Sequence, residues 1–512
     1  MFIQRKTVQL AIAGSILLPF YLSAGSMDKS AADTTFGVNG KVLEVLSADH
    51  GGARNKAVLI EDDDRIIVAG YAKNADNYNV LALYKYLPDG ARDVSFGIGG
   101  ASYTDHVCQD KTCGTKFVHG EEYADSILLQ SDGKIIVTRT DYTGTDGYDP
   151  DPYFGVVRFN RDGTLDRSYG YSGYNIATPG INFAYATSGA IQPDDKVVVA
   201  GAGEIDSVNT RGAMVSRFNA DGSLDTNFAT QGTFYMNPNF AGYSEGANDV
   251  TVQSDGKILI AGNTYVQGCG EDNSTHFMRS RLIRLNPDGS LDHSFNGDGV
   301  LEFNIYAIFD VDPWDLSETH PCRNNYFKSV KVQADGKIVV LGRGYGAIFV
   351  ARFNPNGTLD TSFGYQGARM AYGNYDYTTF DHLNTHFTYV WGRKFSVENM
   401  MLGKNGNIVV SGRITYDDDY YHYGFMAMHF RPDGSFDTRY GTIGDARVDV
   451  NFPNDFLYGG ATAYALGEQS DGKVILAGYA DGYDAPSTAV TTRTIKEQPE
   501  VALPSIIGYL LN

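Results

Sequence analysis

Three stretches of the chain place aromatic side chains beside carboxylates, a combination that suits the binding of sugar rings. An aromatic face packs on the C–H surface of a sugar, while carboxylates accept hydrogen bonds from its hydroxyl groups. The candidate binding residues in these stretches are Tyr142, Tyr148, Asp149, Asp151, Tyr375, Asp376, Tyr377, Asp381, His382, Trp391, Asp417, Asp418, Asp419, Tyr420 and His422. The alternative is that these side chains pack on one another and keep the surface soluble.

Carboxylates in the same stretches are also candidates for acid and base catalysis on a glycosidic bond. No spacing in the sequence places two of them at the separation that this reaction requires, so no catalytic residue is assigned. Calcium is a second candidate ligand because the chain is acidic, with a net charge of −20. The clusters at residues 62–64 and 310–315 come nearest to a calcium loop but lack its glycine and terminal glutamate. No other cofactor is predicted.

Repeated phrases indicate which elements carry these stretches. The first phrase reads Asp, two residues, Phe or Tyr, three residues, Gly, and it begins at Asp33, Asp93, Asp166, Asp225, Asp292, Asp360 and Asp437. The second, Asp-Gly-Lys before an aliphatic run, has some degenerate copies and begins at Asp63, Asp132, Asp194, Asp255, Asp335, Asn405 and Asp471. Because glycine accepts the positive φ of a tight turn, Asp-Gly between apolar runs predicts hairpins. Each repeat therefore reads as four strands, the last of which carries the first phrase.

Seven four-stranded repeats predict an all-β fold, a seven-bladed β-propeller of four-stranded blades. We expect one propeller domain over residues 25–512. The last repeat is expected to take its third strand from residues 505–511 and to lack a fourth. Residues 33–42 would supply that strand and close the ring, which removes exposed sheet edges. An open array of repeats is the alternative.

A basic residue lies eight positions before the repeated Asp in most repeats. We interpret four of these combinations as structural pairs, because a buried charge needs a partner. The pairs are Arg158 with Asp166, Arg217 with Asp225, Arg284 with Asp292, and Arg352 with Asp360. A charged binding ring is the alternative.

In a four-stranded blade, the hairpins that join the first strand to the second and the third to the fourth lie on one face. The connections from the second strand to the third and from one blade to the next lie on the opposite face. The former are tight and alike in this chain, whereas the latter are long and differ from repeat to repeat. Binding residues tend to sit on loops held by a rigid scaffold, so the face with the long connections is the predicted functional face. Its four cysteines are predicted to form a local disulfide, Cys108 with Cys113, and a second one, Cys269 with Cys322.

The phrases SDGKIIV, NPDGSLDHSFNGDG and NPNGTLDTSFGYQG resemble the delta-60 repeat family of bacterial secreted proteins. The resemblance covers nearly the whole chain after residue 24 and implies tandem repeats in a propeller. It implies no shared activity and no catalytic residues. The sixth repeat departs most from the pattern, with Lys404–Asn407 in place of the usual turn and His429 in place of Arg.

Residues 1–24 have the order of a secretory signal peptide: Arg5 and Lys6, then an apolar run, then small residues. An uncleaved membrane anchor is the alternative. We expect a secreted, periplasmic or cell-surface protein with no membrane span after cleavage. Its acidic charge argues against a nucleic-acid partner, which would require clustered Lys and Arg.

The hypothesis for function is an exported binding module, with a glycan or cell-surface polymer bound on the face of the long connections. A propeller hydrolase or lyase that acts on polysaccharide with loop carboxylates is the first alternative. A structural scaffold of the cell envelope that binds a protein partner is the second.

Overall fold

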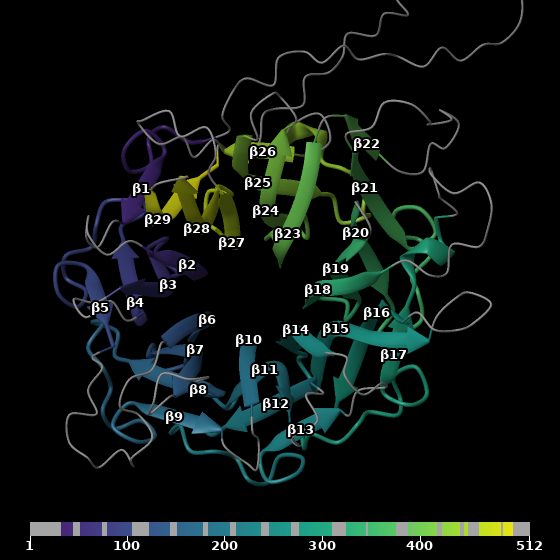
Figure 1. Ribbon diagram of the computed structural model, residues 1–512, viewed down its shortest axis with the longest axis horizontal. Coiled ribbons are helices and arrows are strands. Elements are labelled where there is room, and N and C mark those ends of the chain that lie inside the picture. The colour runs from purple at the N-terminus through teal and green to yellow at the C-terminus, as the bar shows by residue number, and fades with distance from the viewer. Residues whose placement is uncertain are drawn as a thin grey trace, which may run out of the picture. The chain divides into compact units, whose positions relative to one another are not determined.

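The computed structural model describes residues 32–44, 52–73, 79–104, 122–143, 151–177, 183–204, 211–236, 245–267, 276–309, 324–344, 347–374, 388–391, 393–416, 422–440, 445–448, 460–482 and 485–494. All of them belong to one compact unit that spans Ala31–Asn512. They form seven separate sheets arranged around a centre, which confirms the predicted seven-bladed propeller (Figure 1). The described part contains almost no helix, only the short turns Ile305–Ala307 and Thr438–Tyr440.

The blades are numbered in chain order and their strands run from the centre outward. Blade 1 contains β2 (Arg54–Ile60), β3 (Ile66–Lys73), β4 (Asn79–Tyr86) and β5 (Ala101–Tyr103). Blade 2 contains β6 (Glu122–Leu129), β7 (Ile135–Thr143), β8 (Asp151–Phe159) and β9 (Tyr174–Ala177). Blade 3 contains β10 (Phe183–Ile191), β11 (Val197–Glu204), β12 (Gly212–Phe218) and β13 (Thr233–Met236). Blade 4 contains β14 (Gly246–Val252), β15 (Ile258–Gln267), β16 (His276–Leu285) and β17 (Val300–Phe303).

Blades 5 and 7 depart from this plan, whereas blade 6 follows it. Blade 5 contains β18 (Asn325–Val332), β19 (Ile338–Gly344), β20 (Ala347–Phe353), β21 (Ala368–Asn374) and a fifth strand, β22 (Thr388–Trp391), which pairs parallel to β21. Blade 6 contains β23 (Arg393–Leu402), β24 (Ile408–Tyr416), β25 (His422–Phe430) and β26 (Asp445–Val448). Blade 7 contains β27 (Ala461–Glu468), β28 (Val474–Gly482), β29 (Ala485–Arg493) and β1 (Lys41–Glu44).

The middle strands of each blade are buried on both faces. Every residue of β11 and of β12 is buried, and both strands consist mainly of small and aliphatic side chains. Strands covered on both sides read as continuous apolar runs rather than as alternating ones. The core is therefore divided into clusters that each lie between two neighbouring blades, such as the one that joins Ile136 and Val156 of blade 2 to Val197 and Met214 of blade 3.

The N-terminal strand completes the last blade, as predicted. Strand β1 pairs antiparallel with β29, from Lys41 opposite Thr492 to Glu44 opposite Ala489. The predicted third strand at residues 505–511 is wrong, because β29 occupies that place and residues 505–511 lie outside the described ones. The polar sequence of β29 concealed it: its buried threonines are satisfied by hydrogen bonds, as when Thr492 Oγ1 donates to the carbonyl of Gly40 over 2.6 Å.

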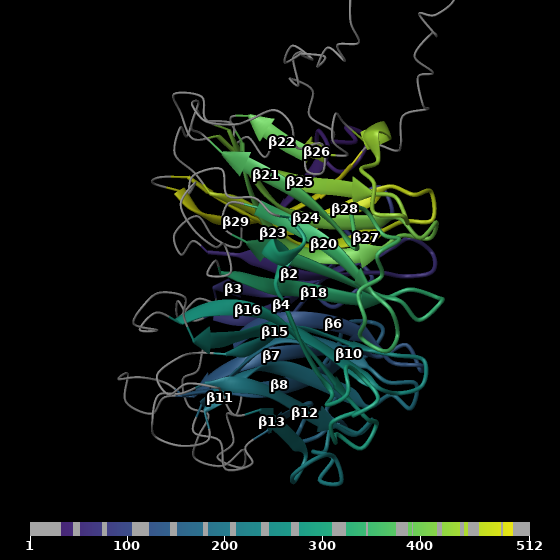
Figure 2. The same ribbon diagram turned by 90° about the vertical axis from the view of Figure 1, so that its right-hand side faces the viewer.

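The repeated Asp–aromatic–Gly phrase is a compact turn and not part of a strand, which corrects the prediction. In blade 2 the Tyr169 N–H donates to the Asp166 carbonyl (3.1 Å), and the Gly173 N–H donates to the Tyr169 carbonyl (2.8 Å). The outer strand β9 begins only after Gly173, whose φ of 105° is one that glycine adopts readily. These turns and the tight hairpins gather along one side of the sheets, at the right in Figure 2.

None of the helical turns in the described ranges is long and apolar enough to cross a membrane. The predicted signal peptide at residues 1–24 lies outside the described residues.

Candidate functional site

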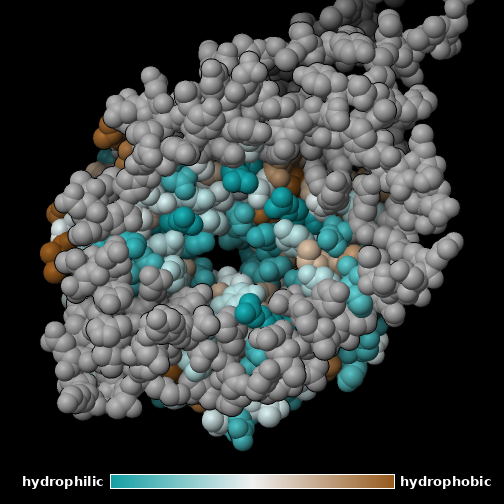
Figure 3. All heavy atoms as spheres, viewed as in Figure 1, coloured by the Kyte–Doolittle hydropathy of each residue, from teal (hydrophilic) through white to brown (hydrophobic). Residues whose placement is uncertain are grey.

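The innermost strands of the seven blades surround a central opening. These strands are β2, β6, β10, β14, β18, β23 and β27, and each contacts the innermost strand of the next blade. Figure 3 shows the opening from one face, with mainly hydrophilic residues around it.

Each innermost strand contains a β-bulge at the same place. The register shifts by one residue against the second strand, and the extra residues are Lys56, Asp125, Thr187, Asn248, Lys328, Glu398 and Tyr464. Bulges bend a strand and redirect a side chain, and they are frequent beside functional sites. We refer to these seven residues as the channel ring.

The sequence determines where the bulges occur. Each bulge residue lies seven positions before the first residue of the following Asp-Gly-Lys phrase or its equivalent, as Lys56 does before Asp63. In five blades a glycine of the second strand lies against the backbone just before the bulge. A Cβ at Gly201 would lie 2.0 Å from the carbonyl oxygen of Tyr185, and the same holds for Gly70, Gly262, Gly412 and Gly478 with their partners at 1.9 Å. Only glycine permits so close an approach of two backbones.

Several ring residues form bonds to the next blade. Thr187 Oγ1 donates to the carbonyl of Ala247 (2.8 Å), and Asn248 Nδ2 donates to the carbonyl of Phe327 (2.7 Å). Lys328 Nζ lies 3.0 Å from Glu398 Oε2. The ring therefore links neighbouring blades around the opening.

Aromatic side chains join the ring at blades 7 and 1. The Lys56 ammonium lies 3.4 Å from the centroid of the Tyr464 ring, which is close enough for a cation–π interaction. The rings of Tyr464 and Tyr479 stack with centroids 5.6 Å apart. Burial lowers the pKa of Lys56, although the nearby carboxylates of Asp125 and Glu398 oppose the shift.

A buried carboxylate follows the bulge in blade 4. Asp249 accepts hydrogen bonds from Ser188 Oγ (2.7 Å), Ser329 Oγ (2.6 Å) and Lys331 Nζ (2.7 Å). Burial by itself raises the pKa of Asp249, but Lys331 and the two hydroxyl groups lower it overall. This carboxylate is therefore ionised at neutral pH and joins blades 3, 4 and 5.

On the opposite side of the blades, the structure brings the predicted Arg–Asp pairs together. The Arg nitrogen to Asp oxygen distances are 2.8 Å for Arg158–Asp166, 2.9 Å for Arg217–Asp225, 2.6 Å for Arg284–Asp292 and 2.7 Å for Arg352–Asp360. All eight residues are buried, and each Asp also contacts a Lys of the hairpin turn, such as Lys134 at 3.0 Å from Asp166. Burial raises the pKa of Asp166, but Ser168, Lys134 and Arg158 outweigh it, so that its pKa lies well below the usual range.

Each pair belongs to a clamp between two blades. The Arg158 guanidinium lies 4.4 Å from the centroid of the Tyr169 ring and donates to the carbonyl of Ala220 in blade 3 over 2.9 Å. The repeat aromatic is fully buried against the turn glycine of the next blade: a Cβ on Gly222 would lie 2.8 Å from Tyr169. The contact between repeat aromatic and turn glycine occurs at six of the described junctions, and an arginine donates to a carbonyl of the next blade at five of them. The phrase is therefore the element that holds the blades together.

One clamp pair escaped the sequence analysis. Arg493 lies 2.9 Å from Asp33 and Lys473 lies 2.8 Å from the same carboxylate. Arg493 lies 20 positions after the turn lysine Lys473, but this spacing ranges from 15 positions (Lys337 to Arg352) to 27 (Lys257 to Arg284) in other repeats, so no fixed spacing marks it. In blade 1, by contrast, Lys85 pairs with Glu61 at 2.6 Å, and in blade 6 Asp437 pairs with Arg439 at 2.6 Å.

The structure does not test the predicted binding residues. Tyr142, Asp151, Trp391 and His422 lie at strand ends next to the long connections, where only their backbone is described. The remaining eleven lie outside the described residues, as do Cys108, Cys113, Cys269 and Cys322. Within the described ranges, no three His, Cys, Asp or Glu side chains are grouped to hold a metal. In the candidate calcium cluster at residues 62–64, Asp64 accepts hydrogen bonds from Ser470 of blade 7, and the candidate cluster at residues 310–315 lies outside the described residues.

Five stretches of the chain match a family described as "Domain of unknown function (DUF5122) beta-propeller": residues 61–96, 130–169, 192–228, 253–295 and 333–363. The chain is a β-propeller repeat protein. Each match spans turns of the clamp, which is the part of the propeller that repeats most closely. No curated protein matches it in sequence.

Solved structures with a similar arrangement of strands share little sequence with this propeller. A protein of unknown function from Dyadobacter fermentans is 12% identical with a TM-score of 0.41, and the match covers 73% of this chain and 95% of that one. The alpha-L-arabinofuranosidase of Fusarium graminearum is 9% identical with a TM-score of 0.41, and the match covers 90% of this chain and 98% of that one. An ulvan lyase is 10% identical with a TM-score of 0.42, and the match covers 87% of this chain and 95% of that one.

Proposed function

We propose that the protein is an exported binding module that holds a glycan or cell-surface polymer over the channel ring, on the face of the long connections. The observation that carries this proposal is a contrast between two sets of equivalent positions. The clamp residues are nearly the same in most blades, as a scaffold requires. The seven ring positions instead carry Lys, Asp, Thr, Asn, Lys, Glu and Tyr, which a scaffold alone does not require.

The chemistry of the ring suits a polyhydroxyl ligand. Its side chains include ammonium and amide donors, carboxylate acceptors and a tyrosine ring, all partly exposed. Sugars need this combination, because each hydroxyl group both donates and accepts while the C–H faces pack on aromatics. The tyrosine-rich connections predicted at residues 141–153, 374–391 and 416–423 would extend the same surface.

The described Asp residues with shifted pKa values are unsuited to act as the acid of a glycosidase, whereas the side chains of the candidate carboxylates in the long connections lie outside the described ones. A glycosidase keeps one carboxyl group protonated by raising its pKa. Every Asp with a shifted pKa in the described part has it lowered, including Asp166, Asp249 and Asp437. These groups are hydrogen-bonded acceptors and fit a binding or structural role.

The proposal is tested by exposing the purified protein to a glycan array and to the polysaccharides that it retains. Binding without release of reducing ends supports a binding module. Release of reducing or unsaturated ends would show a hydrolase or lyase, and an absence of binding to every glycan would favour a protein-binding scaffold.

A further inference from the structure

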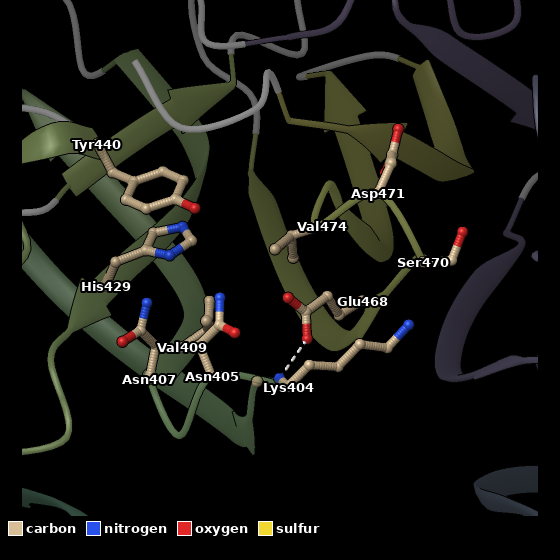
Figure 4. A pocket seen from close by; sticks show the side chains of 12 residues that line it. Lys404, Asn405, Asn407, Val409, His429, Tyr440, Glu468, Ser470, Asp471 and Val474 are labelled. Carbon is tan, nitrogen blue, oxygen red and sulfur yellow. Dashed lines mark hydrogen bonds between the residues drawn. The ribbon is translucent and has the colours of Figure 1, made fainter. Parts of the chain in front are cut away.

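A pocket of about 230 Å³ lies at the junction of blades 6 and 7, on the side of the clamp turns (Figure 4). Lys404, Asn405, His429 and Tyr440 of blade 6 form one wall. Glu468, Ser470 and Val474 of blade 7 lie opposite, and the Lys404 N–H donates to Glu468 Oε2 over 2.8 Å.

At the other six junctions, a turn of the next blade fills the equivalent space. The backbone N–H after the repeat aromatic donates to this turn, as from Gly170 to the Asp221 carbonyl (2.7 Å) and from Gly364 to the Asp433 carbonyl (2.7 Å). At five of these junctions a clamp arginine also donates to a second carbonyl of the turn, as Arg352 does to Pro432 over 2.9 Å. Each of these junctions is thus sealed by main-chain carbonyl groups.

The described residues contain no such turn at the junction of blades 6 and 7. The turn would connect the third strand of blade 7 to its fourth, but these two strands, β29 and β1, come from distant parts of the chain. The described part breaks off at Thr494, where the Thr494 N–H donates to the carbonyl of Val474, a residue of the pocket.

His429 occupies the position that a basic residue has in the other clamps, but no hydrogen bond joins its Nε2 atom to the next blade. It is 1% exposed, its Nε2 atom has no hydrogen-bond partner, and its ring stacks on Tyr440 at 3.6 Å. Burial lowers the pKa of His429 to about 3, so its imidazole is neutral at physiological pH. An arginine at this position would be a buried cation without the carbonyl that the next blade usually supplies.

We propose that the pocket is a binding site for a peptide segment, and that the residues directly after Thr494 occupy it and hydrogen-bond to His429 Nε2. Lys496 lies three positions after Arg493, as Pro287 lies three positions after Arg284. The Pro287 carbonyl accepts the hydrogen bond from Arg217 that seals the junction of blades 3 and 4. Gln498 stands at the sequence position of the turn glycine Gly289, so the segment lacks that glycine. This site is independent of the proposed ligand face, because it lies on the opposite side of the blades.

Amide hydrogen exchange of the full chain tests the proposal. We expect residues 495–500 to exchange at least tenfold more slowly than an unstructured peptide of the same sequence. Asn405→Trp, which fills the pocket, should abolish this protection. Asp132→Trp changes the equivalent exposed position at a filled junction and should leave it intact. Exchange at the unstructured rate in the unmodified protein, or protection that survives Asn405→Trp, would overturn the proposal.

A photo-reactive benzophenone at position 405 identifies the occupant directly. After irradiation and digestion, a cross-link to residues 494–512 supports the proposal. A cross-link to another polypeptide, or none to residues 494–512, would contradict it.

Discussion

Arg493 and Asp33 form an ion pair of 2.9 Å, although they lie 460 positions apart in the chain. In blade 2 the equivalent pair, Arg158 and Asp166, is separated by eight positions. The same clamp therefore has a local role within most blades, but in blade 7 it joins the two ends of the described part and helps to close the ring.

Loss of the closing pair should cost more than loss of a local one. Arg493→Ala leaves Asp33 buried with Lys473 and the hydrogen bonds from Thr35, and breaking a buried pair costs about 3–5 kcal/mol. Arg217→Ala breaks the matching pair in blade 3 without weakening the closure. We expect a lower free energy of unfolding for Arg493→Ala than for Arg217→Ala in urea denaturation. Equal losses would show that the closing pair has no special role.

Acid should weaken the clamps below the ordinary Asp pKa of about 4. In the folded state the hydrogen bonds and cations lower the pKa values of Asp33, Asp166, Asp292 and Asp360. A lowered pKa in the folded state adds stability above pH 4, and this stability is lost as the pH falls towards the folded-state value. The urea midpoint should fall steeply below pH 4, and Asp166→Asn should reduce the steepness. An unchanged slope in this variant would contradict the assignment.

His429 should act in a different pH range. Its pKa lies at about 3 in the folded protein, against about 6.5 when unfolded. Between these values the unfolded state binds the proton, so each unit of pH decrease favours unfolding by up to tenfold. His429→Gln should remove this dependence between pH 6 and 4 while leaving the loss below pH 4. Retention of the full dependence in His429→Gln would assign it to another group.

A side chain on a glycine opposite a bulge should destabilise the blade, because the two backbones at the bulge are in close contact. In Gly201→Ala the new Cβ would meet the carbonyl oxygen of Tyr185 at 2.0 Å, and the backbone must move apart. We expect a loss of about 3 kcal/mol in the free energy of unfolding, at the upper end for overpacking. Gly246→Ala, where the nearest atom is a Cβ at 3.2 Å, should cost less. Calorimetry of both variants measures the difference.

The repeats predicted the blades and the four Arg–Asp pairs because the clamp requires the same residues at the same spacing each time. They did not reveal that the phrase around Tyr169 is a turn, since its hydrogen bonds are local and leave no periodic pattern. The apolar run at residues 505–511 resembled a strand more than the threonines of β29 did, and their burial depends on partners such as Gly40. The channel ring was missed because its members share a position and not a residue type.

The most direct test of the central claim measures the affinity of the protein for the glycan that it selects on an array, in three variants. Tyr464→Ala alters the channel ring, Trp391→Ala alters the predicted face of the long connections, and Tyr171→Ala removes a tyrosine that is 52% exposed on the clamp side. We predict at least tenfold weaker binding for Tyr464→Ala and Trp391→Ala and an unchanged affinity for Tyr171→Ala, with all three variants folded. Unchanged binding in the first two, or loss in the third, would contradict a ligand site over the channel ring.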